Sequence, residues 1–312
     1  MKGFLTRMAA TLATSIVLPC NGALFRPEKE RLAILLVVFG TSYPEAQAAY
    51  ENLRRIYEMK FPDARVEIAF TSSYVRRKIR ERDGICIDNP LTALARLNDE
   101  GYVNACVQSL HVIAGEEFHD MANIVESISK IRGKFGFSNL AIGAPLLMDL
   151  DDYRNVSSAL ASQFDQFTDE AQLMNQTGSG SGSVDASETA IVFMGHGTEH
   201  PANSAYSQMA SVLAADHKNV FLGTVEGYPA FDDVLKRLRA SGAKKVRLMP
   251  FMIVAGDHAL NDLTGKKSDS WKSRLEEEGF VVDFNLRGMG ENDGIAEIFV
   301  QHTRNALRKM TG

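Results

Sequence analysis

The chain has 312 residues, of which 45% are hydrophobic, and it carries a formal net charge of −5. This length and apolar content are enough for two domains with their own cores, and they exclude a disordered or fibrous chain. Charges of both signs are spread without long blocks, which argues against a nucleic-acid-binding protein with a basic stripe.

The first residues have the pattern of an export signal. Lys2 and Arg7 precede a mostly apolar run over residues 8–18, and small residues follow at 21–23. The run is too short to cross a bilayer as a helix, and the alternative interpretation is an amphipathic N-terminal helix. We predict a cleaved signal within residues 1–28, a periplasmic location and no transmembrane segment in the mature chain.

The first half then alternates apolar strands with amphipathic helices. Ser42 and Glu45 form a capping-box pattern at the start of a helix that runs to about Lys60. Strands are predicted at residues 31–39, 65–71, 104–113 and 140–145. Apolar strands separated by helices are typical of a parallel sheet that is covered on both faces. We therefore predict an N-terminal α/β domain at residues 29–170.

The second half begins after a Gly/Ser-rich stretch, which predicts a flexible surface loop at residues 171–188. Strands are predicted at residues 190–194, 220–225, 246–254 and 281–286, and a last helix at 293–310. In this prediction His196 lies in a tight turn that leaves the first of these strands. We predict a C-terminal α/β domain at residues 189–312, whose last helix is a candidate to pack back on the first domain.

The two halves also match each other where their predicted strands end. Residues 38–41 match 195–198, residues 71–74 align with 225–228, and residues 112–117 match 253–258. An internal duplication accounts for this pattern. We expect two similar domains, each a parallel sheet flanked by helices, with an active site in the cleft between the carboxyl ends of both sets of strands.

The strands of the second half are followed by a fuller set of potential metal ligands than those of the first half. Its three strand exits carry His196, Glu226 and His258. The corresponding residues of the first half are Phe39, Ser72 and Glu117. Two imidazoles and a carboxylate make a nitrogen and oxygen site suited to Fe²⁺, Co²⁺, Ni²⁺ or Zn²⁺. One such residue alone is more often a cap or a solvated side chain, but three at equivalent exits favour a metal site.

The other histidines give weaker signals. His111 lies within a predicted apolar strand and His200 at a helix entry, and for each a structural role and a supporting role beside the ligands stay open. His217 and His302 are predicted to be surface residues.

Four runs of residues together resemble the anaerobic cobalt chelatase family, here in a periplasmic form: 39–42, 195–198, 224–229 and 250–259. The resemblance covers residues 33–308. It leaves out the export signal and the Gly/Ser-rich loop, which both depart from the usual cytoplasmic pattern. Members of the family insert Co²⁺ into sirohydrochlorin during cobalamin synthesis, with release of two protons.

The resemblance implies a chelatase fold with the tetrapyrrole in the interdomain cleft and with His196, Glu226 and His258 as metal ligands. A neutral imidazole also accepts protons, so His196 is the predicted proton acceptor. No organic cofactor is required. Since the substrate is a polycarboxylate, amides ahead of helix starts are suited to bind it. The expected substrate-binding residues are Phe39, Thr41, Ser42, Ser72, Glu117 and Thr198. A basic group at residues 76–80 either joins them or forms a solvated helix face.

Several alternatives stay open. The same ligands suit Fe²⁺, whose insertion gives sirohaem. An exported chain could instead bind and transport metal or haem without turnover. His119, shared between two subunits of a homo-oligomer, is a candidate axial ligand for haem iron.

Overall fold

The computed structural model describes residues 31–161, 163 and 188–311. The predicted export signal lies outside these residues, and so does the predicted Gly/Ser-rich loop apart from Glu188. Among the helices described, none combines the length and apolar character that a membrane span requires.

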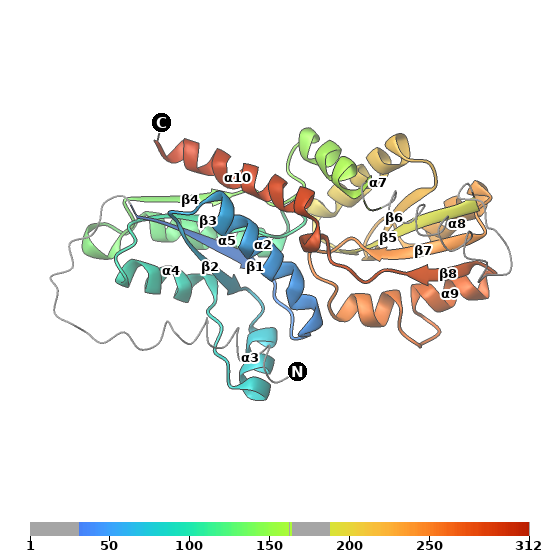
Figure 1. Ribbon diagram of the computed structural model, residues 1–312, viewed down its shortest axis with the longest axis horizontal. Helices are drawn as coiled ribbons and strands as arrows, with labels where there is room; N and C mark the ends of the chain where they lie inside the picture. Colours follow the sequence, from blue (N-terminus) through green and yellow to red (C-terminus); the bar gives the residue numbers. More distant parts are fainter. Residues whose placement is uncertain (1–30, 162, 164–187, 312) are drawn as a thin grey trace.

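Two four-stranded parallel sheets form the framework (Figure 1). The first has the order β2-β1-β3-β4 and contains β1 (Leu32–Val38), β2 (Arg65–Phe70), β3 (Asn104–Ser109) and β4 (Asn139–Gly143). The second has the order β6-β5-β7-β8 and contains β5 (Thr189–Gly197), β6 (Val220–Glu226), β7 (Lys245–Pro250) and β8 (Val281–Phe284). In each sheet the strands are ordered second, first, third, fourth along the chain. The predicted fold of two similar α/β domains is confirmed.

Helices connect the strands of the first sheet, and polar caps fix where several of them begin. They are η1 (Glu45–Gln47), α2 (Ala48–Lys60), α3 (Ser73–Asp83), α4 (Pro90–Asp99), α5 (Glu116–Ser129) and η2 (Gly133–Phe135). The Ser72 side chain accepts a hydrogen bond from the Val75 amide at the start of α3, and Asn89 does the same for Thr92 at the start of α4. Gly84 ends α3 in the left-handed conformation that glycine adopts most readily.

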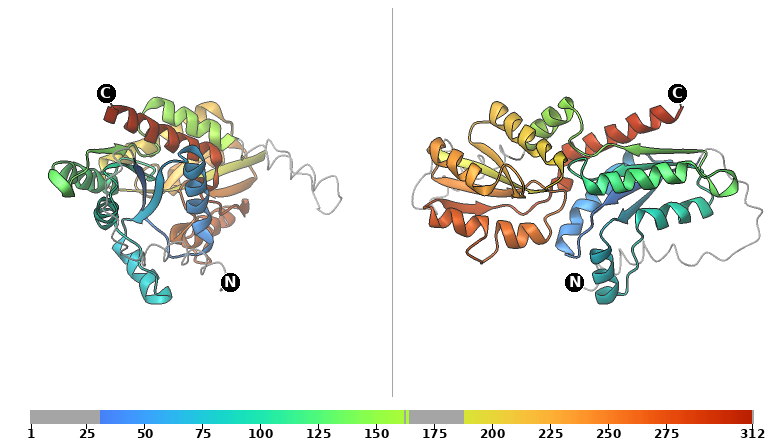
Figure 2. Two further views of the ribbon diagram at one scale, coloured as in Figure 1. Left: turned by 60° about the vertical axis from the view of Figure 1, so that its left-hand side comes forward. Right: turned by 180° about the vertical axis from the view of Figure 1, so that it is seen from behind.

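The second half has an equivalent set: η4 (Pro201–Asn203), α7 (Ser204–Asp216), α8 (Phe231–Ser241), the π-helical turn η5 (Ala259–Leu263), α9 (Trp271–Glu277), η6 (Met289–Glu291) and α10 (Asp293–Thr311). The last helix, α10, follows the second sheet in sequence but packs against β3, β4 and α2 of the first (Figures 1 and 2).

Three apolar clusters form the core. One lies on the α4 and α5 side of the first sheet and another on the α8 and α9 side of the second. The third joins the two halves, because it contains buried side chains of both sheets together with those of α2, α7 and α10. The two sheets are therefore held by one shared core on one side and by separate cores on the other.

Strand ends differ from the sequence-based prediction in a way that matters for the site. β5 continues through Gly197, which pairs with Glu226 of β6, so His196 lies in the strand and not in a turn. β3 ends at Ser109 because its neighbour β1 ends at Val38, which leaves His111 beyond the sheet. β7 ends at Pro250, opposite Met194. Proline has no amide hydrogen to donate to the sheet.

The prediction that His302 is a surface residue is wrong. His302 is buried on α10, where its Nε2 lies 2.8 Å from a carboxylate oxygen of Asp152 and its Nδ1 lies 3.1 Å from the Ala144 carbonyl oxygen. Asp152 also accepts hydrogen bonds from the amides of Met148 and Asp149. The Asp152 contact thus ties α10 to the start of the helical segment at residues 150–161, and the Ala144 contact ties it to the loop after β4. A helix-period pattern alone does not reveal such a buried contact between aspartate and histidine.

His217, the other predicted surface histidine, is partly buried, and its Nε2 lies 2.9 Å from the Ser157 hydroxyl.

The Asp152–His302 pair should give stability a particular dependence on pH. Burial alone would raise the pKa of Asp152, but the hydrogen bonds from His302 and from the two amides leave that pKa below its usual value. Its contribution is therefore present above the unfolded-state pKa of about 4 and is lost as the pH falls through the folded-state pKa. We expect Asp152→Asn to lower the free energy of unfolding by about 2 kcal/mol at pH 7. The difference from wild type should shrink below pH 4 in urea titrations, and parallel pH profiles would contradict this role.

Candidate functional site at the junction of the two sheets

Residues that follow the strands of the two sheets meet at one junction. The Tyr43 hydroxyl donates a hydrogen bond to Asp257 Oδ1 at 2.5 Å. This hydrogen bond raises the pKa of Tyr43 and lowers the pKa of Asp257. The imidazole rings of His119 and His200 lie edge to face with their centroids 5.2 Å apart. The carboxyl ends of both sheets therefore face each other, as expected for an interdomain site.

His196 and Glu226 are brought together by a glycine. Gly197 has a φ of +78°, and a Cβ atom at this position would lie 1.5 Å from the Glu226 carbonyl oxygen. Only glycine fits so close to the neighbouring strand. As a result, His196 Nδ1 lies 4.0 Å from Glu226 Oε2, and both side chains are exposed at the end of the sheet.

His258 reaches the same place from the third strand exit of the second half. It precedes the η5 turn, and its ring lies edge to face with that of His196, with centroids 4.4 Å apart. Its Nδ1 is 2.6 Å from Asp262 Oδ2, one helical turn further along the chain. Sequence analysis missed Asp262, although its spacing of four residues from His258 is the signal that could have identified it.

Both imidazoles are held in the same tautomer. His196 Nδ1 lies 2.8 Å from the Gly197 carbonyl oxygen, which only accepts hydrogen bonds, and His258 Nδ1 faces the Asp262 carboxylate. Each Nδ1 therefore carries the proton, and each Nε2 keeps a lone pair for a metal or a proton. Within the described ranges, no three His, Cys, Asp or Glu side chains already have an arrangement that could hold a metal ion. The side chains would have to rotate to bind one together.

The first half supplies five of the six residues predicted to bind substrate, and they differ in accessibility. Phe39 is 51% exposed after β1. Thr41 and Ser42 are buried, and the Thr41 hydroxyl accepts a hydrogen bond from the Tyr43 amide. Ser72 caps α3, and Glu117 is partly buried in the first turn of α5. Of these five, Phe39 presents the most open surface at the junction.

Thr198 does not offer the free amide that sequence analysis predicted. Its amide donates to Asn203 Oδ1 at 3.1 Å, and its hydroxyl accepts from the His200 amide. Asn203 also donates to the Tyr228 carbonyl oxygen at 2.7 Å. This asparagine, which sequence analysis did not single out, joins the segment after His196 to the segment after Glu226. The His200 side chain caps the η4 turn through the Ala202 amide.

Three buried side-chain atoms lack a hydrogen-bond partner in the part of the chain that the structure describes: Thr71 Oγ1, Arg76 Nε and His111 Nε2. All three follow β2 or β3, the strands on either side of β1. Burial lowers the pKa of His111 to about 4, so this ring is neutral at pH 7. Unpaired buried polar atoms are costly, and these three lie on the segments that follow the two neighbours of β1, the strand that leads to Phe39.

Exposed apolar side chains also lie on the segments that follow the strands. Besides Phe39, they are Tyr74, Met148, Leu150, Tyr228 and Leu260. They follow β1, β2, β4, β6 and β7, so both halves contribute. Sequence analysis identified only Phe39 among them, because exposure of an apolar residue is not visible in a sequence. Such a set favours a large flat apolar ligand at the junction.

His119 is exposed, and the ring contact with His200 is described above. Haem binding at His119 stays a prediction.

Two cavities lie outside this junction. A small polar one of about 240 Å³ contains Asp262, Asp232 and Asp269 among its lining residues. Asp262 connects this cavity to His258 through the hydrogen bond described above. A larger groove of about 540 Å³ lies between α5, β4 and the end of α10. We place the chemistry at the junction and not in the groove, because the imidazole pair is at the junction.

Comparison with known proteins identifies the family to which the chain belongs. The cobalt chelatase (CbiK) family matches residues 32–308, and the chain belongs to this family. Over 276 residues it is 37% identical to the sirohydrochlorin cobaltochelatase of Salmonella typhimurium, covering 88% of this chain and 96% of the relative. It is 34% identical over 279 residues to sirohydrochlorin cobaltochelatase CbiKC of Nitratidesulfovibrio vulgaris, covering 88% of this chain and 90% of the relative.

Solved structures agree on the fold. SirB from Bacillus subtilis with Fe³⁺ superposes with a TM-score of 0.56 at 13% identity, covering 88% of this chain and 95% of that one. The sirohydrochlorin chelatase SirB from Bacillus subtilis subspecies spizizenii, in complex with cobalt, gives a TM-score of 0.54 at 13% identity, covering 89% and 96%. At this identity the likeness concerns the fold alone.

Asp262 should act on metal affinity through the tautomer of His258. Removing a carboxylate that orients a ligating histidine typically weakens metal binding 10- to 100-fold. We expect Asp262→Ala to weaken Co²⁺ binding by this amount in calorimetric titrations. Asp262→Asn should have a smaller effect because the amide oxygen still accepts the Nδ1 proton.

Asp269→Ala is the matched control, since Asp269 lines the same small cavity and has no hydrogen bond to His258. Equal losses of affinity in Asp262→Ala and Asp269→Ala would show a general charge effect and contradict the orienting role.

Proposed function

We propose that this protein is a sirohydrochlorin cobaltochelatase, which inserts Co²⁺ into sirohydrochlorin and releases two protons. The observation that carries the proposal is the His196–His258 pair beside Glu226 at the junction of the two sheets, in a chain of the cobalt chelatase family. The names of the two relatives support the substrate and the metal.

The two imidazoles suit the chemistry of insertion. The tetrapyrrole must lose two N–H protons while the metal loses water. In the tautomer described above, Nε2 of each ring accepts a proton or binds a metal ion, and His196 is the proposed proton acceptor. Glu226 offsets the charge of the incoming cation. Asp262 accepts the Nδ1 proton of His258 and stabilises positive charge on that ring.

The wall of the first half suits the substrate. The exposed rings of Phe39 and Tyr74 and the side chains of Met148 and Leu150 offer apolar contact to the macrocycle. Sirohydrochlorin also carries carboxylates, and Arg76 follows β2 with a buried Nε atom that has no partner. We propose that Arg76 binds one of these carboxylates.

We also propose further properties of this protein and one competing function. Iron insertion giving sirohaem is an alternative activity, because imidazole and carboxylate ligands suit Fe²⁺ as well as Co²⁺. Haem binding at His119, export to the periplasm and assembly as a homo-oligomer are further proposals that rest on the sequence. An exported protein that binds metal or haem without turnover is the competing function.

Turnover separates an enzyme from a binding protein. We expect anaerobic absorbance spectra of excess sirohydrochlorin with Co²⁺ to show many turnovers per wild-type chain. His196→Ala and His258→Ala should lower the rate at least 100-fold because each removes a base and ligand. Both variants should keep the wild-type circular dichroism spectrum. A spectral change that stops at one equivalent of wild-type protein would support the competing function, and full activity in either variant would contradict the site.

Arg76 can be tested as a substrate-binding residue with its neighbour Arg77 as the matched control. Arg77 is exposed, whereas Arg76 is partly buried. We expect Arg76→Gln to raise the KM for sirohydrochlorin about tenfold, because a charge-assisted hydrogen bond contributes about 1.5 kcal/mol or more. Arg77→Gln should leave KM within twofold of wild type. Equal KM values for both variants would show that the α3 arginines form a solvated face.

A further inference from the structure

One surface of the first domain is both basic and apolar, and the proposed chelatase reaction does not use it. The turn after α5, residues 130–135, has the sequence Lys-Ile-Arg-Gly-Lys-Phe, and every residue in it is exposed. Ile131 is 46% exposed and Phe135 67% exposed. The Lys134 ammonium group lies 4.6 Å from the centroid of the Phe135 ring, so charge and apolar surface are interleaved.

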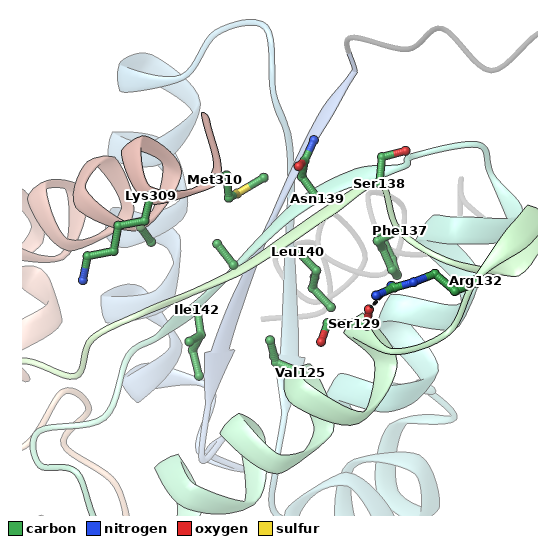
Figure 3. Close-up of a pocket in the computed structure, with 12 residues that line it drawn as sticks. Val125, Ser129, Arg132, Phe137, Ser138, Asn139, Leu140, Ile142, Lys309 and Met310 are labelled. Atoms are coloured by element: carbon green, nitrogen blue, oxygen red, sulfur yellow. Dashed lines mark hydrogen bonds between the residues drawn. The ribbon is translucent and has the colours of Figure 1, made fainter. Parts of the chain in front are cut away.

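The groove of about 540 Å³ lies beside this turn (Figure 3). Its apolar walls come from Val125 on α5, from Phe137 just before β4, from Leu140 and Ile142 on β4, and from Met310 at the end of α10. Arg132 and Lys309 lie on opposite sides of it. Apolar surface at this pole is therefore flanked by cations.

The charge of residues 130–135 and of the groove rim indicates which kind of partner would cover this surface. The turn and the rim of the groove carry Lys130, Arg132, Lys134 and Lys309, whereas the only ion pair described among them joins Lys130 to Glu126. The chain as a whole is negative, so this local excess of positive charge is distinctive. A second copy placed face to face would bring like charges together. An anionic partner is favoured instead.

The position of this surface also matters. The turn precedes β4, and the Ser138 amide bonds to the Val103 carbonyl oxygen just before β3, so the surface lies at the amino ends of the strands. α10 ends here, at the pole away from the second domain (Figures 1 and 2). The junction with His196 and His258 lies at the opposite ends of the strands.

We propose that residues 130–135 and the rim of the adjacent groove dock on the surface of an anionic lipid bilayer. Ile131 and Phe135 enter the boundary between headgroups and acyl chains, and the four cations contact lipid phosphates. Each cation near such a surface strengthens binding about fivefold. Docking is reversible and leaves the junction open to solution.

The test is sedimentation of the full chain with vesicles of phosphatidylglycerol and phosphatidylcholine in equal parts, compared with pure phosphatidylcholine. We expect binding to the anionic vesicles only, weakening strongly between 0.05 and 0.5 M salt because salt screens exposed charges. The double variant Ile131→Ser/Phe135→Ser should bind at least tenfold more weakly, and Lys130→Gln/Lys134→Gln about 25-fold more weakly. Both should keep wild-type turnover of sirohydrochlorin.

Val281→Ser/Phe284→Ser is the control, since these exposed residues lie on the edge strand β8 of the other domain. It should bind as wild type does. All variants share residues 1–30, so any binding through that segment is unchanged by the substitutions.

Equal binding to both kinds of vesicle, or a loss of binding in the control as large as in the turn variants, would overturn the proposal. So would the absence of binding to anionic vesicles. Self-association that the turn substitutions abolish in analytical ultracentrifugation would overturn it as well. That result would assign this surface to a second copy of the chain.

Discussion

Burial of one continuous apolar core beneath both sheets is the constraint on which the rest of the structure depends. Each sheet has its own cluster on one side, but on the other side the side chains of both sheets pack together with α2, α7 and α10. Burying this surface fixes how the two sheets lie relative to each other. The strand exits of the two halves meet because of that packing, and Tyr43 and Asp257 then join them directly.

At the junction, the two halves have divided the work that a metal chelatase requires. The second half carries imidazoles whose tautomers are set by acceptors behind them, and a glycine brings the carboxylate beside one ring. The first half offers exposed aromatic surface and unpaired polar atoms. One wall is thus suited to a cation and the other to a macrocycle with acidic side chains. A duplicated framework has become asymmetric through a few residues at equivalent strand exits.

The sequence predicts the framework well because apolar strands and amphipathic helices have a clear period. The strand exits with His196, Glu226 and His258 follow from the same pattern together with the repeat. Other features depend on contacts between distant residues, which no local pattern contains. Asp152 and His302 form a buried pair across 150 positions. The Thr198 amide is already bound by Asn203, and the extension of β5 depends on its pairing with Glu226. Exposure of Tyr74 or Tyr228 likewise depends on how the whole chain packs.

Because α10 packs on the first domain, the core of that domain is completed only after the second sheet has been synthesised. The sheet of the first half is encoded by residues 32–143, but part of its cover is the final helix, Asp293–Thr311. During synthesis the first domain therefore emerges from the ribosome with part of one side of its sheet uncovered, and it stays so until Asp293–Thr311 has been made. Until that helix docks, the apolar surface that it will cover stays accessible to chaperones.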